Sequence, residues 1–424
     1  MPRPQLIAGC VAFMLLLVSC SKQEPPPPPA AKADPKREQI ERGEYLAAAG
    51  DCTACHTVRG GQPFAGGLAM PTPFGVLYTP NITPDKQYGI GSWSADDFYR
   101  AMHEGRSKDG SFLYPAFPYT NYTKVTRADS DAIYAYIMSL QPVAQKSRPH
   151  EMGFPYNQRQ LMAGWRALYF KPGEFKEDPT QSPEWNRGAY LVEGLGHCNA
   201  CHATRNALGA ITDDDDYSGG LIPVQNWYAP SLTSSKETGL GDWEITEIVE
   251  LLRTGTSERS AVFGPMADVV RHSLSDLSLT DLKAMATYLR AQSEKKASTP
   301  LLQSGPSDEQ AAAMMKTGAR VYKDYCETCH QRNGEGVPRI YPPLANNPAI
   351  TMRNPVNPIR MVLSGGFPPS TEGNPRPYGM PPFYQDLSNE QVASVVTFIR
   401  GSWGNTAEPT TAAEVGRSRG VPAD

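Results

Sequence analysis

The chain has 424 residues, 40 of them proline and eight of them cysteine, and its formal net charge at pH 7 is −4. This length allows about three domains of ordinary size, and the proline content is about twice the usual 5%. A weakly acidic chain lacks the basic excess that marks nucleic-acid binding, so we expect no nucleic-acid partner.

Residues 1–19 are predicted to be a signal peptide. Arg3 supplies a positive charge, and the apolar stretch 6–18 is shorter than the ~20 residues that span a bilayer. The stretch ends in Leu17-Val18-Ser19-Cys20, which resembles the bacterial lipobox, so Cys20 is the expected lipidation site. An ordinary signal peptide with an incidental cysteine is the alternative. Residues 20–36, which include a run of five prolines, are predicted to be an extended linker.

Six of the eight cysteines fall in C-x-x-C-H motifs: Cys52-Thr53-Ala54-Cys55-His56, Cys198-Asn199-Ala200-Cys201-His202 and Cys326-Glu327-Thr328-Cys329-His330. This is the attachment pattern of haem c. Two thiols at this spacing add to the two vinyl groups of one porphyrin, and the histidine that follows binds the iron. We therefore predict three covalently bound haem c groups. The attachment points are Cys52, Cys55, Cys198, Cys201, Cys326 and Cys329, and the proximal ligands are His56, His202 and His330.

Zinc binding and thiol redox chemistry fit these motifs less well. A structural zinc site gathers two cysteine pairs, or one pair and a histidine pair, into one tetrahedral shell. Here the pairs lie more than a hundred residues apart, and a histidine follows each one directly. A thioredoxin-like dithiol would be a single motif in a βαβ setting.

An internal repeat surrounds the motifs and predicts the architecture. Each unit opens with a short helical run before the motif and ends with a helix whose apolar residues recur at three-to-four spacing. The first two units also share Pro80-Asn81-Ile82-Thr83 and Pro230-Ser231-Leu232-Thr233. This order resembles the class I cytochrome c fold. We therefore expect an all-α protein made of three tandem class I cytochrome c-like domains.

The repeat also sets the expected domain boundaries. The three domains are placed at 37–145, 184–292 and 309–404. Between the first two lies an apolar connector, 146–183, which we expect to pack these domains against each other. A polar linker is expected at 293–308, and the polar tail 405–424 is predicted to be disordered.

Methionine opposite histidine raises the potential of a haem and suits an electron carrier. Met266 and Met380 lie between a glycine and the closing helix of units two and three, and they are predicted to be sixth ligands. Methionine packed in the core is the alternative at both positions. Unit one has Phe117 at the matching position, and phenylalanine cannot bind iron. Haem one is therefore five-coordinate or bound by another side chain. The candidates are Met70, Met102 and His103.

The three motifs, together with Asn81-Ile82-Thr83-Pro84-Asp85, Leu161-Met162-Ala163-Gly164-Trp165 and Gly194-Leu195-Gly196-His197-Cys198, resemble a known family over roughly residues 38–405. This family is the triple-haem cytochrome c subunits of bacterial membrane-bound dehydrogenases. The resemblance implies a catalytic partner subunit of the quinoprotein, flavoprotein or molybdenum type. It also implies ubiquinone or a downstream cytochrome or oxidase as the acceptor. Members have methionine where this chain has Phe117.

The resemblance further implies a place on the periplasmic side of a bacterial membrane. Many members anchor through a C-terminal amphipathic segment that this chain lacks, so lipid at Cys20 is the expected anchor. A quinone acceptor favours the inner membrane over the outer one.

The leading hypothesis is therefore an electron-transfer subunit that does not oxidise a substrate by itself. The chain has no nucleotide fingerprint, no flavin motif and no nucleophile–base arrangement. Two alternatives stay open. One is a peroxidase-like enzyme working at an open iron on haem one, and the other is a free-standing electron shuttle or the cytochrome arm of a terminal oxidase.

Overall fold

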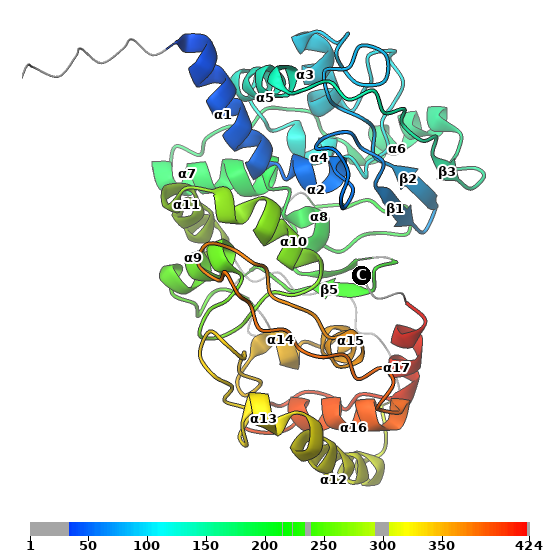
Figure 1. Ribbon diagram of the computed structural model, residues 1–424, viewed down its shortest axis with the longest axis vertical. Coiled ribbons are helices and arrows are strands. Elements are labelled where there is room, and N and C mark those ends of the chain that lie inside the picture. Colours follow the sequence, from blue (N-terminus) through cyan, green and yellow to red (C-terminus); the bar gives the residue numbers. More distant parts are fainter. Residues whose placement is uncertain (1–33, 214, 223, 234–238, 293–304, 422–424) are drawn as a thin grey trace, which may run out of the picture.

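The computed structural model describes residues 34–213, 215–222, 224–233, 239–292 and 305–421. Cys20, the predicted signal peptide and all but the last few residues of the two predicted linkers lie outside these ranges. The described chain is mostly helical, and it carries short strands that the all-α expectation omitted. Figure 1 shows an elongated molecule with the first helices at one end and the last helices at the other.

The elements form three successive units and a connector. The first unit contains α1 (Pro35–Ala49), α2 (Cys52–His56), β1 (Ala69–Thr72), β2 (Gly75–Tyr78), α3 (Ala95–Glu104), α4 (Tyr119–Tyr122) and α5 (Arg127–Ser139). The connector contains β3 (Glu151–Met152), η1 (Arg159–Leu161) and α6 (Met162–Tyr169). The second unit contains α7 (Pro183–Tyr190), η2 (Leu191–Leu195), α8 (Asn199–His202), β4 (Gly220–Ile222), β5 (Trp227–Ala229), α9 (Ile245–Thr254), α10 (Pro265–His272), η3 (Leu274–Asp276) and α11 (Leu279–Arg290). The third unit contains α12 (Asp308–Tyr325), α13 (Glu327–His330), α14 (Pro348–Thr351), α15 (Val356–Ser364), α16 (Asn389–Arg400) and α17 (Ala412–Arg419).

In every unit the helix before the C-x-x-C-H motif crosses the closing helix, so that α1 packs on α5, α7 on α11 and α12 on α16. Each crossing is made at a glycine. A β-carbon on this glycine would lie about 2 Å from a carbonyl oxygen of the closing helix, far inside van der Waals contact. The three contacts are Gly43 with Ala132, Gly188 with Ala284 and Gly318 with Ser394, at 1.9, 2.0 and 2.1 Å. The repeat seen in the sequence is therefore also a repeat of packing.

The closing helices begin at matching residues because a hydroxyl side chain caps each of them. The side chains of Thr126, Ser278 and Ser388 accept hydrogen bonds from the backbone N–H groups of Asp129, Asp281 and Gln391. Such a cap satisfies one of the free N–H groups in the first turn of a helix.

Gly318→Ala is expected to destabilise the third unit, because the new methyl group would push α12 away from α16. Overpacking of this kind costs roughly 3 kcal/mol, and we expect a lower melting temperature of the haem-loaded protein. The matched control is Gly164→Ala in α6, where no atom lies within 4 Å of the new β-carbon. There the better helix propensity of alanine is expected to leave stability unchanged or up to ~1 kcal/mol higher. Equal melting curves for the two variants would contradict this role of the crossing.

The connector begins as an edge strand and then crosses the surface. In the antiparallel sheet β1–β2–β3, Val76 of β2 pairs with Glu151 of β3. Farther along, Phe154 is 82% exposed and Leu168 is 71% exposed. Phe175 packs against Tyr190 of the second unit, with 5.6 Å between ring centroids. The connector thus touches both units as expected, but a large part of its apolar surface is open.

The first two units share one hydrophobic core, whereas the third unit has its own. The shared core joins Leu46 and Ile133 of unit one to Leu191 and Leu282 of unit two. The second core contains Val321, Ile359, Val392, Val396 and Val415. Units one and two therefore pack directly on each other, and Phe175 of the connector packs against the core that they share.

The tail is not disordered within its described part, 405–421, so this prediction is wrong there. Helix α17 has a capping box at Thr411, and Val415 is completely buried. Arg419 donates to the carbonyl oxygen of Tyr384 at 2.6 Å and also to that of Leu387. The composition of the tail is polar, but a few side chains anchor it to α15 and α16.

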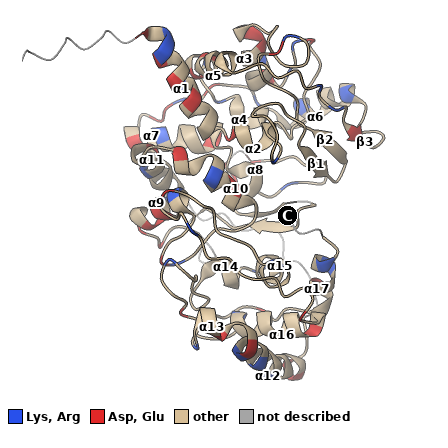
Figure 2. Cartoon of the chain, in the orientation of Figure 1, with Lys and Arg blue, Asp and Glu red and all other residues tan. Residues whose placement is uncertain are grey.

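Within the described residues, no helix combines the length and the hydropathy that crossing a bilayer requires. Figure 2 shows Lys and Arg interspersed with Asp and Glu along the helices, without an extended basic stripe in this view.

Candidate haem sites

Each C-x-x-C-H motif forms or leads into a short helix that comes after the first helix of its unit. Motif one forms α2, motif two leads into α8, and motif three leads into α13. In units one and two, the residue before the first cysteine, Asp51 or His197, adopts a left-handed conformation, with φ of 50° or 37°. This residue follows the glycine that caps the preceding helix, Gly50 or Gly196, and turns the chain into the motif.

The histidine of every motif donates a hydrogen bond from Nδ1 to a proline carbonyl oxygen. The pairs are His56 with Pro80 at 2.8 Å, His202 with Pro230 at 2.7 Å and His330 with Pro342 at 3.1 Å. A carbonyl oxygen can only accept, so Nδ1 must carry the proton and Nε2 is left with its lone pair. A hydrogen bond of this kind fixes the ring of a metal-binding histidine and raises its basicity.

Burial lowers the pKa of His56, His202 and His330, and the proline carbonyl opposes this shift in each case. The imidazoles are therefore neutral at pH 7, which is the state that binds iron. The same tautomer in the three motifs matches the role of proximal ligand predicted for them.

The motif cysteines form no disulfide. Burial raises the pKa of Cys52, Cys55, Cys198 and Cys326 to about 12. Among the described residues, no three His, Cys, Asp or Glu side chains gather where a metal ion could bind. Paired cysteines followed directly by a histidine are the donor set that covalent attachment of haem c requires.

The predicted distal methionines lie beside the cores. Met266 follows Pro265 in the first turn of α10 and packs, partly buried, on the shared core. Met380 packs on the core of unit three, and its backbone exchanges hydrogen bonds with Gly366, at 2.8 and 3.0 Å. This pairing fixes the loop that carries Met380.

Phe117 and Met266 lie in corresponding loops. Leu113 donates its N–H to the Gly105 carbonyl, as Val262 does to the Gly255 carbonyl, both at 2.8 Å. Phe117 lies four residues after the first donor and Met266 four residues after the second. Counted from this bond, unit one places a phenylalanine where unit two places a methionine; the turns that follow, in which Phe117 donates to Tyr114 and Ala267 to Gly264, instead align Ala116 with Met266.

The alternative ligands for haem one occupy three different settings. Met70 lies in β1 opposite Leu77. Met102 is 5% exposed and packs in the shared core. His103 stacks on Tyr99 with 4.8 Å between ring centroids, and its buried Nδ1 has no hydrogen-bond partner in the described structure. The structure does not bring the three together.

Helix α4 of unit one links motif one to motif two. Asn121 Nδ2 donates to Asn199 Oδ1, inside motif two, at 2.8 Å. The next residue, Tyr122, donates its hydroxyl to the Gly50 carbonyl oxygen, just before motif one, at 2.9 Å. In Figure 1, α2 and α8 accordingly lie near each other in the upper half of the molecule.

Similarity to known proteins agrees with this geometry. The family model for cytochrome c matches residues 40–141 and 315–403, in units one and three. The chain is 43% identical over 406 residues to the cytochrome c subunit of gluconate 2-dehydrogenase from Pantoea cypripedii, covering 91% of this chain and 90% of that protein. It is 40% identical over 403 residues to the cytochrome c subunit of alcohol dehydrogenase (quinone) from Gluconacetobacter polyoxogenes, covering 92% and 86%. It is 34% identical over 405 residues to the fructose dehydrogenase cytochrome subunit of Gluconobacter japonicus, covering 90% and 82%.

The chain belongs to the cytochrome c subunits of bacterial dehydrogenases. Covalently bound haem c is the cofactor of this family. It fits the residues described above, since each unit presents paired thiols and a neutral, oriented imidazole.

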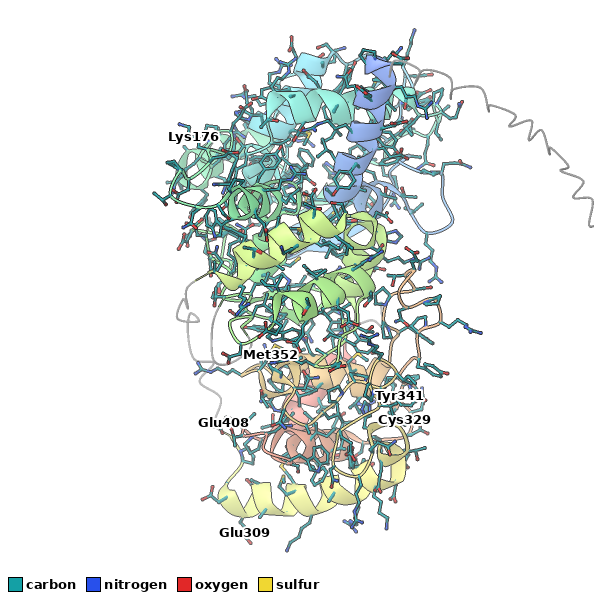
Figure 3. All side chains as sticks on the ribbon, turned by 90° about the vertical axis from the view of Figure 1, so that its left-hand side faces the viewer. Lys176, Glu309, Cys329, Tyr341, Met352 and Glu408 are labelled. Carbon is teal, nitrogen blue, oxygen red and sulfur yellow. The ribbon has the colours of Figure 1, made fainter. Side chains whose placement is uncertain are left out.

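The third motif of this cytochrome c subunit lies in the other half of the molecule. Helix α13 is near the lower end in Figure 1. Figure 3 shows Cys329 and Tyr341 close together on one flank of unit three, and contact with Cys329 adds to the effect of desolvation in raising the pKa of Tyr341. Unit three meets unit two through Asn357, whose side chain bonds both backbone groups of Tyr228 at 2.8 Å.

Sequence reasoning missed the residues that support the proximal histidines. Pro80 and Pro230 stand in the repeat that the first two units share, but nothing in that pattern indicates that their carbonyl oxygens orient His56 and His202. Pro342 has no such repeat around it. The three prolines lie 24, 28 and 12 residues after their histidines, so no fixed spacing marked them in the sequence.

Proposed function

We propose that this cytochrome c subunit carries electrons from a catalytic dehydrogenase subunit to ubiquinone or to a downstream cytochrome or oxidase. In this proposal it holds three haem c groups in three tandem class I cytochrome c-like domains. Lipid at Cys20 holds it on the periplasmic side of a bacterial membrane, and the inner membrane fits a quinone acceptor best. The observation that carries the proposal is the threefold repetition of one ligand geometry, histidine Nδ1 on a proline carbonyl.

The relatives support a catalytic partner. Their names assign them to gluconate, alcohol and fructose dehydrogenases, and the alcohol dehydrogenase is described as a quinone enzyme. For this chain we propose a partner of the quinoprotein, flavoprotein or molybdenum type. The motif residues of this chain are suited to bind haem. We therefore expect the partner subunit, and not this chain, to select the substrate.

The side chains of the protein have separate tasks in this function. The cysteine pairs would tether each group, and His56, His202 and His330 would hold its iron. Met266 and Met380 would supply a thioether ligand in units two and three. Bound haem c supplies one-electron redox chemistry.

The test uses the haem-loaded protein purified alone and together with the catalytic subunit that accompanies it in membranes. Alone, it is expected to be reduced by dithionite and to show no dehydrogenase activity with gluconate, alcohols or fructose. With the partner present, substrate is expected to reduce the haem spectrum. Robust substrate oxidation by the purified subunit would overturn the proposal.

A second candidate function rests on Phe117, which the sequence repeat aligns with Met266. An open iron in unit one would make the protein a peroxidase-like enzyme. The same preparation distinguishes the two functions. Rapid turnover of peroxide, with a spectral change on adding carbon monoxide, would favour the enzyme over the carrier.

A further inference from the structure

Tyr45, on α1 of unit one, reaches across to the closing helix of unit two. Its hydroxyl donates to Asp281 Oδ2 at 2.6 Å. The same hydroxyl accepts the backbone N–H of Ser278, the residue that caps α11, at 3.2 Å. The two partners lie more than 230 residues farther along the chain. One hydroxyl therefore ties unit one to the start of the last helix of unit two.

Tyr190, on α7 of unit two, makes the same contacts in the opposite direction. Its hydroxyl donates to Asp129 Oδ2 at 2.6 Å. It accepts the backbone N–H of Thr126, the cap of α5, at 3.3 Å. The two units thus contact each other reciprocally, as two subunits do across a two-fold axis.

Each of the two carboxylates also binds an arginine of its own unit. Arg187 forms two bonds to Asp281, both at 2.8 Å, and Arg42 binds Asp129 Oδ1 through Nε at 2.9 Å. Asp129 is 2% exposed and Asp281 is 7% exposed. Burial raises the pKa of the Tyr45 and Tyr190 hydroxyls, so both stay protonated and can donate. Hydrogen bonds to a buried carboxylate are among the strong ones in proteins.

The third unit shows that the fold of a single unit does not need this arrangement. Gly318 makes the same helix crossing as Gly43 and Gly188. Beside it, however, Thr317 stands in place of the arginine and Arg320 in place of the tyrosine. Gln391 replaces the aspartate, and its side chain accepts the N–H of its own cap residue, Ser388, at 2.9 Å. The tyrosine–aspartate contacts therefore belong to the pairing of units one and two.

We propose that Tyr45 and Tyr190 are positioning residues that hold motifs one and two at a fixed separation, so that electrons exchange between these two sites. The inference rests on the proposed electron-transfer function. Tyr45 lies on the helix that ends at Ala49, just before Cys52, and Tyr190 lies on the helix that leads to Cys198. A change in how the units meet at these tyrosines therefore moves the motifs themselves.

Two further contacts place the motifs on the same interface. Asn121 of unit one bonds inside motif two, to Asn199. A β-carbon on Gly50 would lie 3.4 Å from Leu195 Cδ2, so the approaches to the two motifs touch.

The test is the double variant Tyr45→Phe/Tyr190→Phe of the full haem-loaded chain. The rings stay in place and only the two hydroxyls are lost. We expect an unchanged haem content, a weaker magnetic interaction between the oxidised irons of units one and two, and a several-fold slower electron exchange between them. Each single variant is expected to show part of the effect, and these variants serve if the double variant does not fold.

The matched control is Tyr134→Phe, which removes a hydroxyl bond of 2.7 Å to the Trp93 carbonyl within unit one. It is expected to leave the magnetic interaction and the exchange rate unchanged. The proposal is overturned if the double variant behaves as the unaltered protein, or if Tyr134→Phe has the same effect. Neither outcome bears on the proposed electron-transfer function. That function is contradicted instead if the unaltered protein exchanges no electrons between its haems.

Discussion

Replacement of both Cys326 and Cys329 by serine is expected to leave two covalently bound haem c groups on a chain for which we propose three. Serine cannot form the thioether, so unit three loses its attachment points. Units one and two have a core that shares no residue with the core of unit three, and their haem content is therefore expected to stay intact. The mass of the denatured protein counts the attached groups directly.

The control is Tyr341→Phe, which alters a neighbour of Cys329 without removing a thiol and is expected to leave the count at three. Replacement of both Cys198 and Cys201 by serine is expected to affect unit one as well as unit two. Unit two shares a core with unit one, and Asn121 of unit one bonds inside the altered motif. If the unaltered protein carried fewer than three attached haem groups, the expected count of three would be wrong and the prediction would fail.

Met266→Leu and Met380→Leu are each expected to lower the reduction potential of one haem and leave the others near their original values. Thioether ligation opposite histidine raises the potential, and leucine provides no ligand. Axial ligands set haem potentials over a range of ~0.8 V, so we expect a shift on the order of 0.1 V or more. A spectroscopic redox titration measures it, together with loss of the thioether-to-iron absorption of that haem.

Two controls accompany these variants. Met285→Leu changes a methionine that is 2% exposed in the same unit as Met266, and it is expected to leave all potentials unchanged. Phe117→Leu, at the position that the sequence repeat aligns with Met266, is expected to do the same, because neither residue binds iron. A fall in one potential on Phe117→Leu, or no change on Met266→Leu, would show that the register between units one and two does not identify the ligand.

The sequence predicted those features that depend on short separations along the chain. Each C-x-x-C-H motif is complete within five residues, and covalent attachment needs no distant partner. The repeat, with Gly43, Gly188 and Gly318 in register, predicted the helix that precedes each motif and the helix that closes each unit. The departure at Phe117 was also visible, since it required only that units one and two be aligned.

The tail shows why composition alone misled. Residues 405–424 contain few apolar side chains, and by this measure they resemble a disordered segment. In the described part, one completely buried valine, Val415, and the hydrogen bonds of Arg419 suffice to hold α17 in place. A few well-placed contacts do not alter an average over twenty residues.

What the sequence determined by itself is the chemistry of the protein: paired thiols, an adjacent imidazole, and their repetition along one chain. The tertiary structure alone decided which motifs are neighbours, because that relation depends on side chains far apart in the sequence. Tyr45 meets Asp281 across 236 positions, and Asn121 meets Asn199 across 78. No local spacing encodes such contacts. They arise only when two units bury a common core, and this burial makes motifs one and two a pair and leaves the third motif apart.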